Sequence, residues 1–436
     1  MMATYAKKLL DVFRPAVAIG LLWANSVCAQ IDEQSGQQVD LRVTKENATN
    51  NGPVNRAGPA AQNGDLSSLD QGGPLRGLTL SLSAGLGYDD NVFRTENNTR
   101  SDTFWLVRPD AYFDFASGKH GYRLGYEGEY AHYFEHSTED YDDHRLFATA
   151  EFDLTRKLDF NLGIEGYYGH DPRGSIGTRL IVPGDLDKWF QYSVAADLVI
   201  GRPITRAQII PSIEFSGVRY LNNNQSIRDY DRQDFRLRGA WRFNPRFYGI
   251  AEGGFANIDH LDDNNLLDRT ETDFLVGFGW QATAKTSGEA MFGILYRDFS
   301  NPVSADNSNP TWDIRVHWAP KTYSKFTAYT RRSSRENAGG VGNFLADTYG
   351  LRWQHGFTRR FNFLSSIDYT VTDFSTPRQD DYVIFDVGLT YQMTRWLRAG
   401  VSYQYLNRRS NIPGIDYDDQ KYLFELTAAT DRALDL

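Results

Sequence analysis

Three arginines share one side of a short segment near the middle of the chain. Arg236 and Arg238 are two positions apart, and Arg242 follows four positions later. Residues separated by an even number of positions point to the same side of an extended strand, so the guanidinium groups would form one row. Such a row could guide an anionic sugar, because guanidinium groups bind carboxylates through paired hydrogen bonds. Alternatively, each arginine pairs with a carboxylate on a neighbouring strand and stiffens a wall, which is the arrangement we expect.

Carboxylates occur in adjacent pairs at several points of the chain. Clustered oxygen ligands can hold divalent cations such as calcium. No pair has the spacing of a calcium-binding loop, so we expect solvated loop ends, with no metal and no cofactor. The pairs are Asp89-Asp90, Asp142-Asp143, Asp262-Asp263, Asp380-Asp381 and Asp418-Asp419.

The histidines give no sign of a catalytic arrangement. A hydrolase needs a nucleophile, a base and a group that orients the base. No histidine lies near a Gly-x-Ser-x-Gly or similar frame, and no metal-ligand or phosphate-loop spacing occurs, so we predict no catalytic residue and no enzyme. The eight histidines are His120, His132, His136, His144, His170, His260, His317 and His355.

The segments that carry these residues alternate between apolar and polar side chains. Between Asp381 and Thr394 the apolar positions are Val383, Phe385, Val387, Leu389, Tyr391 and Met393, and the polar face includes Asp386, Gly388, Thr390 and Gln392. A period of two indicates a strand with one apolar and one polar face. Strands of soluble sheets average about 5–6 residues, whereas a tilted strand needs about 9–11 to cross a membrane. Most segments run to ten residues or more.

Connections between these segments are of two kinds that alternate along the chain. Tight ones such as Arg156-Lys157 and Thr394-Arg395 alternate with long polar ones such as 89–101 and 171–188. Short turns at one end and long loops at the other are typical of outer-membrane barrels. The predicted fold is therefore all-β, a transmembrane antiparallel β-barrel of the outer-membrane type with about 18 strands, wide enough for a water-filled lumen. The segments are 77–88, 102–116, 121–135, 143–156, 158–170, 189–201, 205–221, 231–244, 246–259, 270–284, 287–299, 310–320, 323–333, 345–358, 361–374, 381–394, 396–409 and 418–430.

Composition excludes several other classes of protein. The 436 residues carry a net charge of −10, which disfavours nucleic acid as a partner. A single cysteine excludes a disulfide scaffold. Mean hydropathy is −0.52 and no run of eighteen apolar residues occurs, which excludes a helical membrane protein.

The first 76 residues differ from the rest. Lys7, Lys8 and Arg14, the apolar stretch from Ala16 to Trp23 and the small-residue cleavage site Val27-Cys28-Ala29 predict a signal peptide over 1–29. Residues 30–76 are polar and without a period, which predicts a disordered periplasmic leader; a docking tail for a partner is the alternative. The barrel is predicted over 77–436.

Polar positions of the predicted strands should face the lumen. The candidates are Arg236, Arg238, Arg242, Asp313, Arg315, Arg352, Asp386, Arg398 and Glu425. Inward tyrosines could stack on sugar rings along a sliding track, or could instead belong to girdles at the membrane interfaces. These tyrosines are Tyr112, Tyr133, Tyr167 and Tyr220.

The end of the first predicted strand carries a short motif, Gly87, Tyr88, Asp89, Asp90, Asn91, Val92 and Phe93. This motif, after a polar exported leader, resembles the outer-membrane β-barrel porin family that is often encoded with exopolysaccharide synthesis clusters. The resemblance covers residues 77–436. It implies a Gram-negative outer-membrane channel that serves as the outer port for export of a secreted polysaccharide. It implies no catalytic residues.

Two other functions stay open at this stage. A general or nutrient-specific diffusion porin fits the same pattern, and an enzyme at the membrane face is the least supported alternative. Expected partners are outer-membrane lipid and lipopolysaccharide, and the barrel assembly machinery, which could read Tyr422, Phe424 and Leu426 in the last strand. The resemblance adds polysaccharide and a periplasmic export protein. The expected location is the cell outer membrane, after cleavage near Ala29.

Overall fold

A computed structural model describes residues 77–176, 184–201, 205–261, 267–283, 285–302, 304–336 and 343–430. The predicted signal peptide and leader lie outside these residues and stay predictions. Within the described part of the chain, no helix is long and apolar enough to cross a membrane.

The described residues form eighteen antiparallel strands and two single-turn 3₁₀ helices, η3 (Ser137–Glu139) and η4 (Ser226–Arg228). The strands are β1 (Gly77–Asp89), β2 (Asp102–Ser117), β3 (His120–Tyr133), β4 (Tyr141–Thr155), β5 (Leu158–Asp171), β6 (Asp187–Ile200), β7 (Ala207–Tyr220), β8 (Tyr230–Asn244), β9 (Phe247–His260), β10 (Arg269–Thr283), β11 (Thr286–Phe299), β12 (Asn307–Lys321), β13 (Ser324–Glu336), β14 (Asn343–Gly356), β15 (Phe361–Phe374), β16 (Gln379–Thr394), β17 (Leu397–Ser410) and β18 (Tyr417–Ala429).

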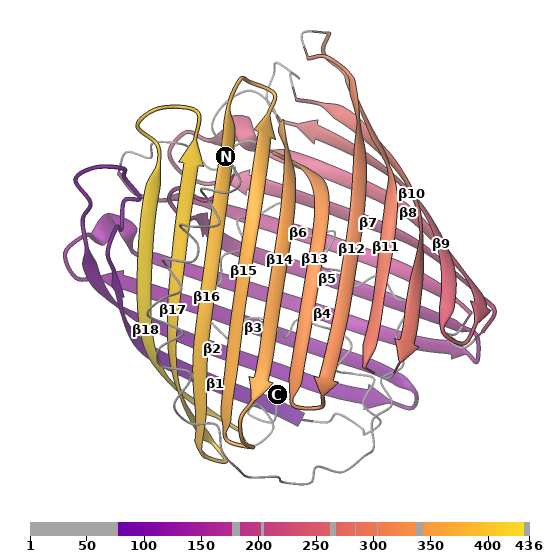
Figure 1. Ribbon diagram of the computed structural model, residues 1–436, viewed down its shortest axis with the longest axis horizontal. Coiled ribbons are helices and arrows are strands. Elements are labelled where there is room, and N and C mark those ends of the chain that lie inside the picture. The colour runs from indigo at the N-terminus through magenta and orange to yellow at the C-terminus, as the bar shows by residue number, and fades with distance from the viewer. Residues whose placement is uncertain are drawn as a thin grey trace. The chain divides into compact units, whose positions relative to one another are not determined.

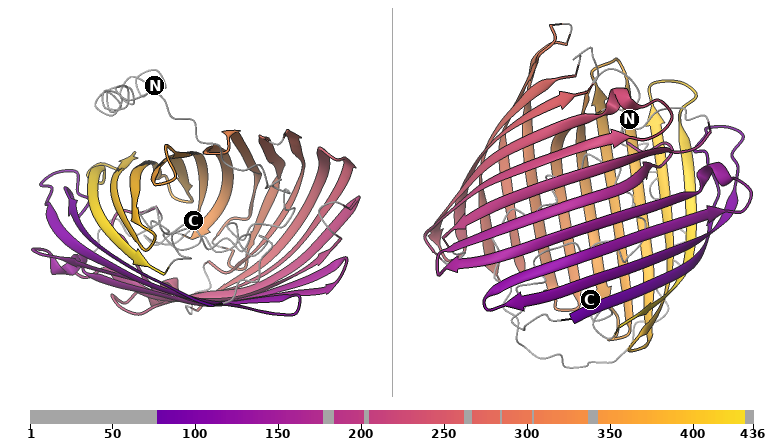
Figure 2. Two further views of the ribbon diagram at one scale, coloured as in Figure 1. Left: turned by 90° about the horizontal axis from the view of Figure 1, so that it is seen from below. Right: turned by 180° about the vertical axis from the view of Figure 1, so that it is seen from behind.

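Each strand pairs with its neighbours in the sequence, and the first pairs with the last. Residues 81–89 of β1 lie in register with 421–429 of β18, so the sheet closes on itself and leaves no free edge. In Figure 1, strands β13 to β18 lie in front and cross over β2 to β6, and Figure 2 shows the same wall of early strands from behind. The predicted eighteen-strand barrel is confirmed, and no strand boundary differs from its predicted position by more than three residues.

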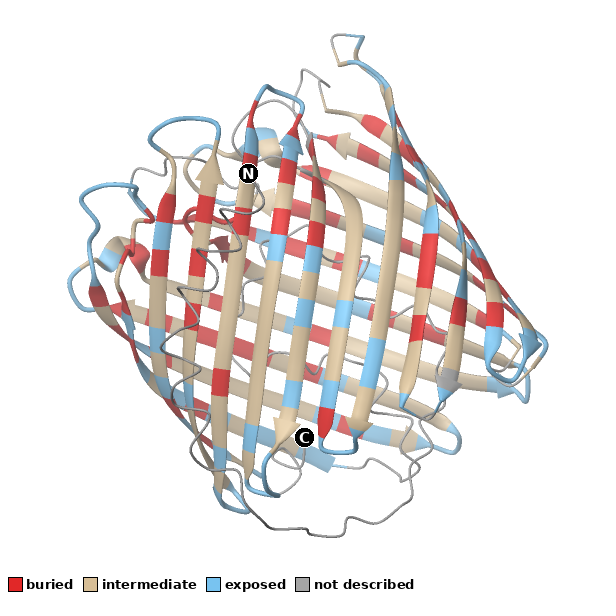
Figure 3. Cartoon of the chain, in the orientation of Figure 1, coloured by how far each residue is buried: buried red, intermediate tan, exposed pale blue. Residues whose placement is uncertain are grey.

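The alternating pattern divides the wall into two faces. Apolar side chains on the outer face are exposed, as Leu237 (55%) and Val401 (49%) show, whereas polar neighbours on the other face are less exposed, as Arg238 (5%) and Glu425 (9%) show. Figure 3 marks the buried, intermediate and exposed positions along the strands. Side chains diverge from a convex wall and converge inside a concave one, so the polar face is the inner face. In a bilayer, lipid would cover the apolar outer face.

The two ends of the barrel differ in their connections. At one end, here the turn end, most connections have two residues, for example Gly118-Lys119 between β2 and β3. At the other, here the loop end, the β1–β2 and β5–β6 connections span residues 90–101 and 172–186. Buried apolar clusters lie under these loops, and one of them comprises Phe344, Ala346 and Phe374 on β14 and β15.

Candidate functional site

The inner face carries all nine of the polar residues that the sequence analysis selected. They are Arg236, Arg238 and Arg242 on β8, Asp313 and Arg315 on β12, Arg352 on β14, Asp386 on β16, Arg398 on β17 and Glu425 on β18. Their neighbours along each strand point outward, among them the exposed Leu351 and Phe424. That any of the nine contacts a solute stays a prediction.

Two arginines of the row on β8 are held by carboxylates from neighbouring strands, and the third, Arg242, donates to the Pro245 carbonyl at 3.2 Å. Arg236 Nη1 donates to Glu252 Oε1 at 2.6 Å and to Asp273 Oδ2 at 3.0 Å. Arg238 donates to the other oxygen of Glu252 at 3.1 Å and, across two strands, to Glu289 at 2.8 Å. The side chains of Arg238 and Glu252 are 6% and 8% exposed, so this network is an internal part of the wall.

The remaining inner residues differ in how far they are paired. Arg108 on β2 reaches past β1 to Glu425 at 2.6 Å. Asp386 accepts a hydrogen bond of 2.7 Å from Gln404. In contrast, Arg352 and Arg398 make no side-chain hydrogen bond to any residue that the structure describes, and Arg352 Nε is buried without a partner. These two guanidinium groups, like that of the inward-facing Arg331 on β13, therefore keep hydrogen-bonding capacity for a solute.

The inner tyrosines do not form an open stacking track. Tyr112 donates to Glu127 at 2.9 Å, and Tyr167 donates to Asp143 at 3.4 Å. Tyr220 lies under the guanidinium of Arg228, 3.7 Å from its ring centroid, and Tyr133 is buried in an apolar cluster. They face inward, so they are not girdle residues either. These tyrosines instead contact other residues of the barrel wall.

The motif at the end of β1 joins the first strand to the last. Lys421 on β18 lies 2.8 Å from Asp89, and the Gln420 backbone N–H donates to Asp90 at 2.7 Å. Asn91 Nδ2 donates to the Asp418 carbonyl at 2.8 Å, and its own Oδ1 accepts from the backbone N–H of Thr95. We refer to this group as the seam clamp. Because β1 and β18 are the ends of the sheet, these contacts fix the barrel closure at the loop end.

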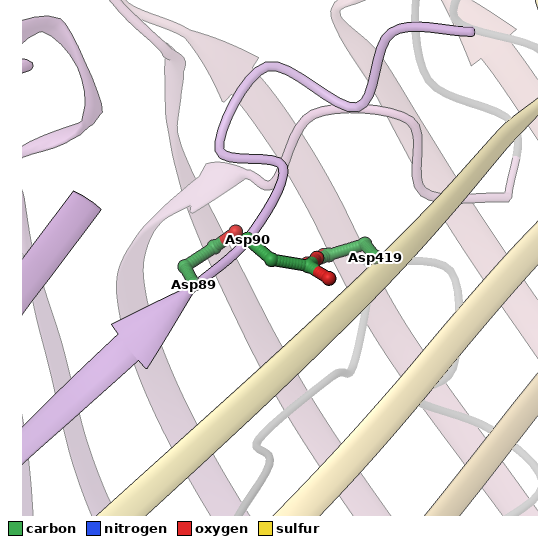
Figure 4. Close-up of side chains that lie close together, drawn as sticks. All are labelled: Asp89, Asp90 and Asp419. Carbon is green, nitrogen blue, oxygen red and sulfur yellow. The ribbon is translucent and has the colours of Figure 1, made fainter. Parts of the chain in front are cut away.

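Charge within the seam clamp is balanced internally. Asp89, Asp90 and Asp419 place carboxylate oxygens within 4.8 Å of one another (Figure 4). Lys421 pairs with Asp89, and Arg94 Nε lies 3.0 Å from Asp419, so cationic side chains already contact the cluster. Burial, and after it the charge of Asp89, raise the pKa of Asp90. Burial alone would lower the pKa of Arg94, but the adjoining Tyr417 and Asp419 reverse this and raise it.

The expectation that the acidic pairs are solvated loop ends is wrong for four of their members. Asp89, Asp143, Asp380 and Asp419 are 1%, 6%, 0% and 0% exposed. Each sits at the inner face of a strand end and pairs with a basic group, as His170 does with Asp143 at 2.8 Å and Arg378 does with Asp380. Inward orientation, which a loop composition does not reveal, explains the difference. The pair Asp262-Asp263 lies outside the described residues.

A short segment after β5 leaves the wall and enters the mouth of the barrel. We refer to residues 172–176 as the strap. Arg173 pairs with Glu139 of η3 at 2.7 Å, and its guanidinium lies 5.5 Å from the ring centroid of Phe93. Arg94 Nη1 donates to the Arg173 carbonyl, and the Tyr417 hydroxyl donates to the Gly174 carbonyl at 2.8 Å. Arg94 and Tyr417, which adjoin the seam clamp, thus hold the strap.

The strap reaches the opposite side of the barrel. Ile176 packs against the cluster of Phe344, Ala346 and Phe374 on β14 and β15. Around the closed sheet, β14 is nine strands from β5 in either direction, which is half of the eighteen. A chain that leaves β5 and contacts β14 a few residues later must cross the loop end from one wall to the other. The strap therefore divides the mouth at this end.

Sequence reasoning did not find the strap residues. The contacts of the strap join positions that are far apart in the sequence. Arg94 and Arg173 are 79 residues apart, and Gly174 and Tyr417 are 243 residues apart. The one local signal is Gly174, whose φ of +63° favours glycine. A Cβ at this position would lie 2.7 Å from the Tyr417 ring.

Comparison with known proteins assigns this architecture to a family. The family model described as "Putative beta-barrel porin 2" matches residues 78–430. The chain belongs to this porin family. The predicted membership of an outer-membrane β-barrel porin family is thereby confirmed, whereas the link to exopolysaccharide synthesis stays a prediction.

Solved structures with a similar fold include three Pseudomonas aeruginosa proteins. The crystal structure of OpdK with vanillate has 11% identity and a TM-score of 0.45, and the match covers 82% of this chain and 100% of that chain. OpdO has 13% identity, a TM-score of 0.46 and coverage of 81% and 97%. OccK2 (OpdF) has 12% identity, a TM-score of 0.47 and coverage of 82% and 99%. Similarity at this level does not identify a solute. No curated protein matches the sequence.

Proposed function

We propose that this porin is a passive diffusion channel for small hydrophilic solutes. The observation that supports it is the inner face itself, a closed ring of hydrogen-bonded charged and polar side chains with apolar residues on the opposite side of every strand. Barrels of 16–18 strands leave an aqueous channel, whereas narrower ones are filled by their side chains. A polar lining lets water and hydrated solutes pass without a large desolvation cost.

The strap supports a limit on solute size. It crosses between opposite walls and is held by an ion pair, a hydrogen bond to Tyr417 and apolar contacts. Anchoring at both sides makes it a fixed obstacle rather than a freely moving loop. We therefore propose that small solutes pass beside the strap and that large ones are excluded by it.

Polysaccharide export stays a prediction from the family resemblance. The inner tyrosines that could have formed a track for sugar rings are engaged with the wall. No contact in the described part of the chain favours a polymer over a small solute. The diffusion porin is therefore the function that the geometry supports best.

Transport in purified lipid systems tests the proposal. The purified full-length protein, inserted in planar bilayers, should give stepwise ohmic currents. In liposome swelling assays it should pass monosaccharides faster than oligosaccharides, with a cut-off that shifts upward when the strap is loosened. Absence of conductance and of swelling would contradict the proposal.

Deletion of the gene distinguishes the diffusion hypothesis from the export hypothesis. A diffusion porin predicts slower uptake of particular small solutes with surface polysaccharide unchanged. Loss of surface polymer, with repeat units accumulating inside the barrier and small-solute uptake intact, would instead establish the export function.

A further inference from the structure

Exposed cations occur at every connection of the turn end. Seven of the eight turns contain at least one described lysine or arginine between their strands, and the eighth is flanked by Lys321 and Lys325. All of these side chains belong to exposed residues. The cations between strands are Lys119, Arg156, Lys157, Arg206, Arg246, Lys285, Arg359, Arg360 and Arg395. We refer to them, with Lys321 and Lys325, as the basic ring.

The basic ring does not follow from overall composition. The chain has a net charge of −10, yet the described residues between the strands at the turn end include no aspartate or glutamate. The acidic groups nearest to a turn, such as Asp153 beside Lys119, lie within the strands. Carboxylates gather instead at the loop end, where Asp89, Asp171 and Asp380 lie. The excess of positive charge is therefore confined to one end of the barrel.

Large aromatic side chains accompany the basic ring. Trp241, Tyr323, Phe357 and Trp396 are 48%, 47%, 53% and 50% exposed, and each lies within four residues of a turn. The guanidinium of Arg206 lies 5.1 Å from the ring centroid of Trp241. Amphipathic rings of this kind mark the level of lipid headgroups, with the acyl chains on one side and water on the other. The cations beside them therefore lie at the level of lipid phosphates.

The distribution of the ring indicates what it contacts. One cation or more in every turn surrounds the barrel evenly, as a shell of lipid does, whereas a partner protein would need charge gathered on one side. We propose that the basic ring binds the phosphodiester headgroups of anionic phospholipid in the leaflet at the turn end. Each lysine or arginine near a charged bilayer surface adds a favourable interaction that salt screens. The proposal is independent of the solute that the porin passes.

Lipid selectivity at the barrel surface tests the proposal. The folded full-length protein is placed in phosphatidylcholine vesicles that contain about one fifth phosphatidylglycerol, with bromine on the acyl chains of one lipid at a time. Bromine quenches tryptophans that contact those chains, such as Trp241 and Trp396. We expect phosphatidylglycerol to be preferred about threefold over its mole fraction, and this preference to vanish at about 0.5 M salt.

Two matched variants make the test specific. In R246Q/R359Q/R360Q/R395Q the preference should fall to nearly one, while R246K/R359K/R360K/R395K should keep it, because lysine retains the charge. A difference in gel mobility between the unboiled and the boiled protein shows that both variants are folded. Equal quenching by the two lipids in the wild-type protein would overturn the proposal, as would an undiminished preference in the glutamine variant.

Two further outcomes identify other ligands. If inorganic phosphate at constant ionic strength abolishes the preference, the ring binds free phosphate and the lipid assignment is wrong. If soluble polyanion binds to the ring while the two lipids quench equally, a soluble partner is indicated and the proposal fails. Conductance measured in the same lipids reports on the diffusion function separately, so the two proposals can fail independently.

Discussion

Arg94 Nε lies 3.0 Å from the carboxylate of Asp419, and the side chains of both residues are almost fully buried. The contact joins the β1–β2 loop to β18, and the same guanidinium donates to the Arg173 carbonyl on the strap. Removal of such a buried charged group lowers the stability of the fold, because its carboxylate, carbonyl and hydroxyl partners stay buried without a hydrogen-bond donor. One arginine therefore couples barrel closure to the position of the segment that crosses the mouth.

Loosening the strap should widen the channel. Arg94→Gln removes the ion pair to Asp419 and the bonds to the strap, and Gly174→Ala displaces the strap through a Cβ clash with the Tyr417 ring. Both variants should show a higher single-channel conductance and a larger solute cut-off in swelling assays. Arg100→Gln, an exposed change in the same loop, is the control and should behave as wild type. Unchanged conductance in both strap variants would show that the strap does not restrict the pore.

An introduced charge should impair folding far more on the outer face of β17 than on its inner face. Val401 is 49% exposed on the outer face, whereas its neighbour Ser402 points inward beside Gly388. Arginine on the lipid face of a barrel costs about 2–4 kcal/mol near the bilayer midplane, and much less toward water. Val401→Arg should therefore lower the folding yield in lipid vesicles far more than Ser402→Arg. Equal yields, or the reverse order, would contradict the assignment of faces.

Alternation alone was enough to predict the strands. The polar and apolar sides of 381–394 differ so regularly that a shift by one residue would place Phe385 in the lumen and Asp386 in lipid. The tight turns then fix where each strand ends. The local sequence therefore predicts the number of strands, their boundaries to within three residues and the face on which each side chain lies.

Contacts between distant positions could not be predicted in the same way. Nothing near Arg173 indicates that it pairs with Glu139, or that Ile176 meets Phe344 on the far wall. The network of Arg238 with Glu252 and Glu289 was anticipated as a type of contact, but the partners depend on strand register and curvature. The burial of Asp419 likewise follows from the closure of β18 onto β1.

Asp90 should make stability depend on pH. Its pKa is raised in the folded state by burial and then by Asp89, so the folded protein binds this proton more tightly than the unfolded chain does. The stabilisation is complete below the unfolded pKa and is lost as pH rises through the folded pKa. Asp90→Asn cannot titrate. The difference in Tm, wild type minus Asp90→Asn, should therefore rise as pH falls from about 6 to about 4.

Thermal unfolding in detergent at a series of pH values measures this difference. Glu96→Gln removes an exposed carboxyl from the same loop and controls for the loss of one charge. A difference for Asp90→Asn that stays flat or decreases toward pH 4 would contradict the prediction.

Arg238 and Arg398 should separate wall stability from solute selectivity. Arg238 is 5% exposed and bridges Glu252 and Glu289, so Arg238→Gln breaks both ion pairs and leaves Glu252 with Arg236 alone. Loss of one partner of a fully buried pair costs about 3–5 kcal/mol. We expect a smaller loss of stability here, because Glu252 keeps Arg236 and Glu289 is 31% exposed. The Arg398 side chain makes no hydrogen bond within the described residues, so Arg398→Gln should change stability little. It should instead lower the permeability of the pore to anions relative to cations, because a lumen guanidinium that can contact solutes is lost.

Thermal unfolding and the reversal potential in a salt gradient measure these two effects on the same preparations. Arg398→Lys retains the charge and should retain the wild-type reversal potential. Arg238→Gln should lower the Tm and leave the reversal potential nearly unchanged. Arg398→Gln should shift the reversal potential and leave the Tm nearly unchanged. If Arg238→Gln alters selectivity without destabilising the barrel, the β8 row acts on solutes and the wall-stiffening interpretation is wrong.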